Sequence, residues 1–196
     1  MKLSKDYKNH IKKQIEKSIN VKKQVLEKNL NVINDVSNVF INAFKNGKKV
    51  YWMGNGGSAA DAQHLACELI SKFLIDRDAL QSIALTTNSS AITGISNDYS
   101  FDKVFERQVE AFVEKNDVLV GISTSGKSKN VTNALKLGKK KGAITISFSG
   151  IYKKDMEKYS NYIISIPTDE TPRIQESHIM IGHIICEIVE NELFGE

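Results

Sequence analysis

The sequence predicts an α/β protein that is built on a parallel β-sheet with helices on both faces. Short apolar segments of strand type recur along the chain, and segments with helical spacing separate most of them. Strands that alternate with helices pair in parallel, so both faces of the sheet become covered. The chain has 196 residues, of which 41% are hydrophobic, and this is enough for one sizeable core. We therefore expect a single domain over residues 1–196.

The N-terminal segment before the first strand is predicted to be helical. Apolar residues recur every three or four positions from Tyr7 to Phe44, and no glycine or proline interrupts them before Gly47. The pattern fits one long helix, or two helices with a break near Asn20.

Five short apolar segments are predicted as strands. They cover residues 50–53, 82–86, 118–123, 143–148 and 162–166. The first and the third lead directly into loops that are rich in glycine or serine.

The helices between these strands carry recognisable start and stop signals. Ser58 can cap a helix that runs to about Phe73, with Asp61 completing a capping box. Helical spacing also covers residues 101–113 and 130–140. The last helix has Thr171 as its cap and Pro172 in its first turn, and it continues through Phe194.

Composition restricts the class of protein. The net charge of +4 is too small to indicate a nucleic-acid binder, and a solvated helix face explains the lysines near the N-terminus. Cys67 and Cys186 lie in apolar helical patterns, form no disulfide framework, and fit a reducing compartment. No run of eighteen apolar residues and no signal-peptide core is present. We expect a soluble, cytoplasmic protein without a membrane or nucleic-acid partner.

Two loops follow strands and open helices, which is where parallel sheets bind anions. The sequence GNGGS at residues 54–58 allows close backbone approach, although an ordinary strand-to-helix turn explains it equally well. The sequence GISTSGKS at residues 121–128 offers three serines and a threonine, whose hydroxyls can donate to phosphate oxygens. For this second loop, a phosphate site is the favoured interpretation over a turn without a ligand.

The second loop also matches the pattern G-x-x-x-x-G-K-[ST] of nucleotide-binding loops. A nucleotide hydrolase would need a nearby strand that ends in an aspartate to hold magnesium. The later strands end in SFSG and in ISIPTD, the latter interrupted by Pro167. A P-loop nucleotide-binding protein is therefore an alternative that the residues leave open.

His64 and Glu68 are four residues apart, so they share one face of the helix after the glycine loop. Such a pair can bind a divalent metal or transfer protons, although an exposed helical contact is the commoner meaning. The last helix adds Gln175, His178 and His183 in an apolar segment, and we interpret His178 as a core histidine. Gln175 and His183 lie about 12 Å apart along the axis, so a shared metal would require residues from different subunits or extended side chains.

Five ordered motifs together resemble the phosphoheptose isomerases, or sedoheptulose-7-phosphate isomerases, of the sugar isomerase (SIS) domain superfamily. They cover nearly the whole chain: GNGGSAAD, HLACE, SND at residues 96–98, GISTSGKS and RIQESHIMIGHI. The resemblance implies a flavodoxin-like three-layer sandwich with a five-stranded parallel sheet and a long N-terminal helical segment. It also implies a homotetramer with sites between subunits, in which residues 1–47 serve oligomerisation and residues 48–196 form the α/β core.

The resemblance further implies specific ligands. One Zn²⁺ per subunit would be bound by His64, Glu68, Gln175 and His183. The sugar phosphate would be held by Ser123, Thr124, Ser125 and Ser128. The sugar itself would be contacted by Gln175 and by Asn55, Gly56, Gly57, Ser58, Asn97 and Asp98. Lys127 is incidental on this interpretation. Where some members have an aspartate before Arg-Ile-Gln, this chain has Pro172, with Asp169 three residues earlier.

The implied activity converts sedoheptulose 7-phosphate to D-glycero-D-manno-heptose 7-phosphate, for lipopolysaccharide or capsule. We expect proton transfer through an enediol, with Glu68 as general base and His183 as general acid. The competing hypothesis within the superfamily is a non-catalytic SIS-domain protein that binds a replication initiator. Such a protein lacks the full metal set, whereas this chain keeps Glu68 and His183.

Overall fold

The computed structural model describes residues 6–153 and 155–195, so the first five residues of the predicted N-terminal segment lie outside it. Its helices are α1 (Lys8–Lys45), α2 (Gly57–Ile70), α3 (Ser89–Asp98), α4 (Val104–Phe112), α5 (Lys129–Lys140), α6 (Met156–Tyr159) and α7 (Thr171–Phe194), with a 3₁₀ turn at Phe101–Lys103. Its strands are β1 (Val50–Gly54), β2 (Ser82–Ala84), β3 (Val118–Ser123), β4 (Ile144–Ser149) and β5 (Tyr162–Ser165).

The five strands form one sheet in the order β2-β1-β3-β4-β5, and every neighbouring pair is parallel. This is the flavodoxin-like order, which confirms the predicted fold class. The chain leaves β1 towards β2 on one side and returns to place β3 on the other side of β1. In such a sheet, ligands bind where the order reverses, at the carboxyl ends of β1 and β3.

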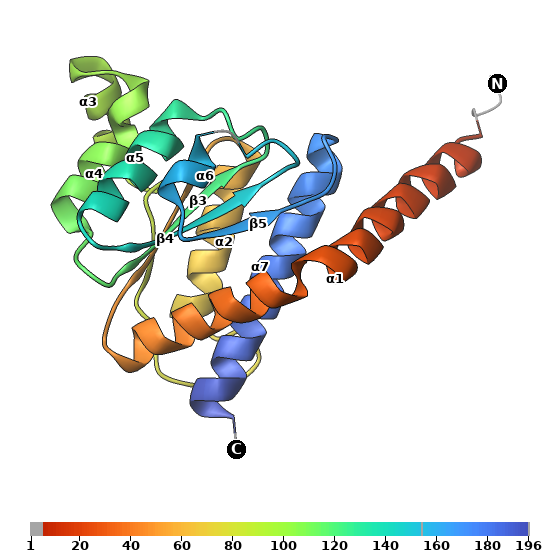
Figure 1. Cartoon of the computed structure of the whole chain (residues 1–196), viewed down its shortest axis with the longest axis horizontal. Coiled ribbons are helices and arrows are strands. Elements are labelled where there is room, and N and C mark those ends of the chain that lie inside the picture. Colours follow the sequence, from red (N-terminus) through yellow and green to blue (C-terminus); the bar gives the residue numbers. More distant parts are fainter. Residues whose placement is uncertain (1–5, 154, 196) are drawn as a thin grey trace, which may run out of the picture.

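Alternate residues of the central strands pack on opposite faces of the sheet. Val50 and Trp52 of β1 belong to a core shared with α1, α2 and α7. Tyr51 and Met53 belong to a second core, shared with α4 and α5. Figure 1 shows the resulting layers, with α4, α5 and α6 on one side of the sheet and α2, α7 and α1 on the other.

From Lys8 to Lys45 the N-terminal segment is one unbroken helix, so of the two predicted alternatives the single helix is correct. α1 spans 38 residues. Its C-terminal half crosses α7, whereas its N-terminal half extends away from the rest of the molecule (Figure 1).

Some predicted helix boundaries are wrong, among them both ends of α2 and the start of α7. Gly56, at φ of 56°, is the N-cap residue of α2, and Ser58 lies within the first turn instead of capping it. α2 ends at Ile70 because the following residues turn towards α7. α7 is preceded by Glu170 as its cap residue, and Thr171 is its first helical residue.

Two helices were not predicted from the sequence. α3 has no buried residue, so the apolar spacing that reveals the other helices is weak there. α6 has only four residues, which is too short for a periodic signal. Over the described residues, no helix combines the length and the apolar character needed to cross a membrane.

His178 of α7 is a core residue, as predicted. Its side chain is fully buried, and its Nε2 lies 3.1 Å from the backbone oxygen of Ser149. The ring meets Phe148 edge to face, with centroids 5.6 Å apart. Desolvation lowers the pKa of His178 to about 4, against the partly opposing effect of the Ser149 hydrogen bond.

We expect this histidine to make folding depend on pH between 6.5 and about 4. The unfolded chain binds a proton at His178 in this window and the native state does not, so stability falls as pH falls. The full loss is about 3 kcal/mol. His178→Gln retains a donor for Ser149 and should flatten the dependence, as measured by urea unfolding at both ends of the window. His10→Gln, at an exposed histidine, should leave it unchanged; equal slopes in all three proteins would contradict the assignment.

Candidate active site

The glycine loop lies beside the serine loop, because β1 and β3 are neighbours and Gly54 pairs with Ile122. The glycine loop allows α2 and α7 to approach each other closely. A Cβ atom on Gly57 would lie 2.3 Å from the side-chain nitrogen of Gln175. Glycine at this position therefore allows an amide of α7 to rest on the first turn of α2.

The serine loop is held in shape by contacts within the protein. Ser123, at the end of β3, is buried, and its Oγ lies 2.9 Å from the Oγ of Ser128. The backbone N–H of Lys127 donates to the Oγ of Ser125 at 3.3 Å. Gly126 has φ of 64°, and a Cβ there would lie 2.3 Å from the backbone oxygen of Tyr152. The loop thus ends at the N-terminus of the 12-residue helix α5, where the helix dipole favours an anion.

A reciprocal pair of amides joins the two loops, and the sequence analysis did not identify it. Asn55 donates to the Oδ1 of Asn130 at 3.0 Å, and Asn130 donates to the Oδ1 of Asn55 at 2.9 Å. The Oδ1 of Asn130 also accepts from the N–H of Val131 at 2.9 Å. The Asn55 side chain, which was predicted to contact the sugar, is paired with Asn130 and ties the glycine loop to α5. Its contact with the sugar stays a prediction.

Three of the four predicted metal ligands meet on the surface between α2 and α7. The Nε2 of His64 lies 3.2 Å from the Oε1 of Glu68 and 2.8 Å from the Nε2 of His183. One donor atom from each residue lies within 4.8 Å of the others. The side chain of His64 is 49% exposed and that of Glu68 is 21% exposed, so the cluster is open to solvent.

Gln175, the fourth predicted ligand, lies elsewhere in the same chain. α2 and α7 run parallel, with Gln175 beside Gly57 and Gly182 beside Leu65. Gln175 is therefore about two helical turns, or roughly 12 Å, from His183 along α7. Within one chain the four predicted ligands do not converge, and the four-residue site remains a prediction.

Asn97 and Asp98 are also remote from this cluster. They are exposed at the end of α3, where Asn97 donates to Asp98 at 2.9 Å. α3 lies at the far side of the molecule from α7 in Figure 1. Asp169 is exposed just before α7.

Phe73 is a further neighbour of the cluster that the sequence did not indicate. Its ring centroid lies 5.6 Å from that of His183, with the planes inclined by 37°. The residue was predicted as the end of a helix, but it belongs to the connection after α2.

Comparison with known proteins identifies the family of this chain. The SIS domain family model matches residues 14–150. The phosphoheptose isomerase of Clostridium acetobutylicum is 52% identical over 191 residues, which cover 96% of this chain and 97% of that protein. The chain belongs to the phosphoheptose isomerase family.

Two further comparisons support membership of the phosphoheptose isomerase family. Phosphoheptose isomerase 2 of Campylobacter jejuni is 51% identical over 189 residues, covering 95% of this chain and 94% of that protein. The solved phosphoheptose isomerase of Neisseria gonorrhoeae is 34% identical and superposes with a TM-score of 0.89, covering 95% of this chain and all of that one. The chain is therefore an aldose–ketose isomerase, and the non-catalytic alternative is not supported.

Membership of the phosphoheptose isomerase family argues against the nucleotide-binding alternative, and the ends of the strands beside β3 argue against it too. The strands beside β3 are β1 and β4, which end in Gly54 and Ser149. Neither strand ends in the aspartate that a P-loop enzyme uses for magnesium. Lys127 is exposed, and its incidental role stays a prediction.

We expect Asn130→Ala to destabilise the protein by about 1–3 kcal/mol, because it leaves the amide of Asn55 without its partner. Urea unfolding measures this loss. Asn133→Ala on the same helix removes a single amide-to-carbonyl bond, to Asp102, and should cost less. An equal or smaller loss for Asn130→Ala would show that the reciprocal pair does not hold the two loops together.

Proposed function

We propose that the chain converts sedoheptulose 7-phosphate to D-glycero-D-manno-heptose 7-phosphate, the first step of heptose biosynthesis for lipopolysaccharide or capsule. The observation that carries this proposal is the convergence of His64, Glu68 and His183 within 4.8 Å. An imidazole and a carboxylate that face each other can move protons between adjacent carbons and oxygens. The serine loop supplies a separate site for the phosphate.

The three converging residues fit a divalent metal, which we propose to be one Zn²⁺ per subunit. Two nitrogens bound at about 2.0–2.1 Å in tetrahedral geometry lie about 3.3 Å apart. The two Nε2 atoms are now 2.8 Å apart, so a small rotation of either imidazole suffices. Three protein ligands with an open position are typical of catalytic zinc, whereas mixed nitrogen and oxygen donors admit other metals.

We assign the proton transfers to Glu68 and His183. Glu68 removes a proton from C1, beside the C2 carbonyl, while His183 donates a proton to the carbonyl oxygen, which gives the enediol. The C1 hydroxyl then returns a proton to His183 and Glu68 delivers its proton to C2, which leaves the aldose. The Oε1 of Glu68 faces His64, so Oε2 is the oxygen assigned to this transfer. A metal held by His64, Glu68 and His183 would stabilise the negative charge that develops on the two oxygens.

The serine loop would bind the phosphate of the substrate, and the glycine loop would contact its sugar. Four hydroxyl residues and the N-terminus of α5 would bind the phosphate: Ser123, Thr124, Ser125 and Ser128. The sugar chain would extend over the glycine loop, past Gly56, Gly57, Ser58 and Gln175. Binding energy at the phosphate, remote from the reacting carbons, would orient these carbons at Glu68.

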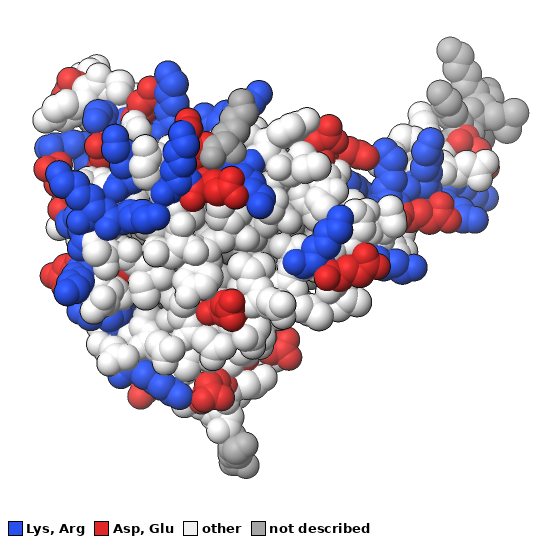
Figure 2. Space-filling model, viewed as in Figure 1, with Lys and Arg blue, Asp and Glu red and all other residues white. Residues whose placement is uncertain are grey.

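We propose a homotetramer in which neighbouring subunits complete each site. α1 carries an exposed apolar stripe, formed by Ile11, Ile15, Ile19, Leu26 and Leu30, each between 48% and 60% exposed. In Figure 2, Lys and Arg gather over α4, α5 and α6, whereas the surface over the C-terminal half of α1 and α7 is mostly uncharged. A second subunit on this surface could bring Gln175, Asn97 or Asp98 to the cluster. On this proposal residues 1–47 assemble subunits and residues 48–196 carry the chemistry.

We also propose a cytoplasmic location. Cys67 and Cys186 are both free thiols, which is typical of a reducing compartment.

Glu68→Gln should lower kcat by about 100-fold or more, which is the usual contribution of a general base. Binding of the sugar phosphate should persist, because the serine loop is unchanged. A coupled isomerase assay, with titration calorimetry for binding, measures both quantities. A variant with full turnover would remove Glu68 from the mechanism.

Ser125→Ala should raise KM about tenfold with little change in kcat, because it removes one hydrogen bond to a charged group. Lys127→Ala in the same loop is the matched control and should retain activity. If Lys127→Ala instead abolished a magnesium-dependent ATP affinity, the nucleotide-binding interpretation would return. A wild-type protein that neither carries metal nor isomerises the sugar would refute the proposed function.

Leu26→Glu combined with Leu30→Glu should dissociate the assembly, because both exposed leucines lie on the apolar stripe. Light scattering coupled to gel filtration measures the change in mass. Lys28→Glu, an exposed position on the same helix, should leave the mass unchanged. If the wild-type protein is already a monomer, the tetramer proposal fails.

A further inference from the structure

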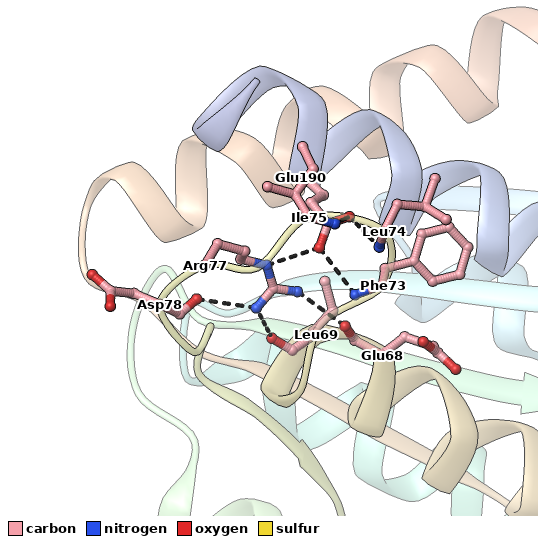
Figure 3. A network of polar contacts seen from close by, with 8 residues as sticks. All are labelled: Glu68, Leu69, Phe73, Leu74, Ile75, Arg77, Asp78 and Glu190. Atoms are coloured by element: carbon pink, nitrogen blue, oxygen red, sulfur yellow. Dashed lines mark hydrogen bonds and ion pairs between the residues drawn. The ribbon is translucent and has the colours of Figure 1, made fainter. Parts of the chain in front are cut away.

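The connection from α2 to β2, residues 71–81, is held by a buried ion pair. Arg77 of this connection and Glu190 of α7 meet at 3.0 Å between Nε and Oε1, and each side chain is only 1% exposed. Figure 3 shows the network that surrounds them, which reaches from the end of α2 to α7. The sequence analysis did not identify this pair.

Arg77 closes the C-terminal end of α2. Its Nη1 donates to the backbone oxygen of Leu69 at 2.8 Å, and its Nη2 donates to that of Glu68 at 3.0 Å. The last four carbonyls of a helix have no partner within the helix. Arg77 satisfies two of them, in the turn that carries the Glu68 carboxylate.

Glu190 fixes the other half of the connection. Its Oε1 accepts from the N–H of Phe73 at 3.0 Å, and its Oε2 accepts from those of Leu74 at 2.6 Å and Ile75 at 2.9 Å. Phe73 is thereby held with its ring against His183. Glu190 and His183 are seven residues, or two turns, apart on α7, so they share one face of that helix.

We propose that Arg77 and Glu190 are positioning residues for the metal-binding cluster. One arm of the network fixes the turn of α2 that carries Glu68, and the other arm places Phe73 against His183. This inference rests on the proposed function, since it assigns the network a role in metal binding and turnover. A purely structural role would affect stability alone.

The test uses Arg77→Lys in the full-length protein. Lysine keeps a positive charge beside Glu190 but has a single nitrogen, so it cannot also hold both carbonyls of α2. The matched control is Arg107→Lys, the same change at an exposed ion pair with Glu110. Zn²⁺ affinity is measured by competition with a chromophoric chelator, well below the unfolding temperature. The kcat and KM for sedoheptulose 7-phosphate are measured at saturating Zn²⁺.

We expect Arg77→Lys to bind Zn²⁺ about 10- to 100-fold more weakly, which is the usual effect of losing support behind a metal ligand. The kcat should fall while KM stays within about twofold, because the serine loop does not contact the network. Arg107→Lys should match wild type in all three quantities. If Arg77→Lys lowers only the unfolding temperature, leaving Zn²⁺ affinity and kcat unchanged, the proposal is overturned.

Phe73→Leu provides a second test that leaves the ion pair intact. If Arg77→Lys does not fold, this variant tests the positioning role instead. Loss of the ring beside His183 should weaken Zn²⁺ binding several-fold, with the midpoint of unfolding close to wild type. Wild-type affinity in a folded Phe73→Leu variant would exclude that arm. These results separate the proposed function from the positioning role. If the wild-type enzyme binds Zn²⁺ and turns over but the variants are unaffected, only the positioning role is refuted. If the wild-type protein has neither metal nor activity, both are refuted.

Discussion

The close parallel packing of α2 on α7 is the constraint on which the candidate site depends. A Cβ on Gly182 would lie 2.5 Å from the side chain of Leu65, so only glycine allows the two helices to approach so closely at this level. His64 precedes Leu65 and His183 follows Gly182, and their Nε2 atoms are consequently 2.8 Å apart. Glu68 joins them because it lies one turn further along α2. The cluster is therefore a result of how two helices pack on one face of the sheet, and its geometry is fixed by residues that never touch a substrate.

Much of this arrangement could be predicted from the sequence, because its signals are local or periodic. The strands, the glycine and serine loops, and the i, i+4 relation of His64 and Glu68 all follow from spacing within short segments. The pairing of α2 with α7 could not be predicted in this way, since no local pattern says which helices meet. The same reason explains the missed Asn55–Asn130 and Arg77–Glu190 pairs, whose partners are 75 and 113 residues apart. Ser58 was misjudged as the cap because Gly56, which can adopt positive φ, occupies the N-cap position two residues earlier.

Within one chain, the predicted site residues lie apart and the metal-binding cluster is open to solvent. His64 is half exposed, Gln175 lies about two turns away, and α3 carries Asn97 and Asp98 on the other side of the sheet. Metal-assisted proton transfer is favoured where water is excluded, because charges interact more strongly there. The apolar stripe of α1 is a surface that also gains from burial. Assembly would satisfy both needs together, and it would connect the exposed stripe of α1 to the chemistry, in addition to the core that α1 shares with α2 and α7.

The Arg77–Glu190 pair is poorly explained as a source of stability alone. Removing two charges from water costs several kcal/mol, which a buried ion pair rarely recovers in full. Here nearly every donor and acceptor of the pair is used. The backbone partners include Glu68 itself and Phe73, whose ring packs against His183. α2 also lacks the glycine that commonly ends a helix, and Ser71 stands at its cap position. The ion pair thus replaces a simple cap with one that is anchored on α7. A glycine would end α2 equally well, but it would not tie that end to the helix that carries His183.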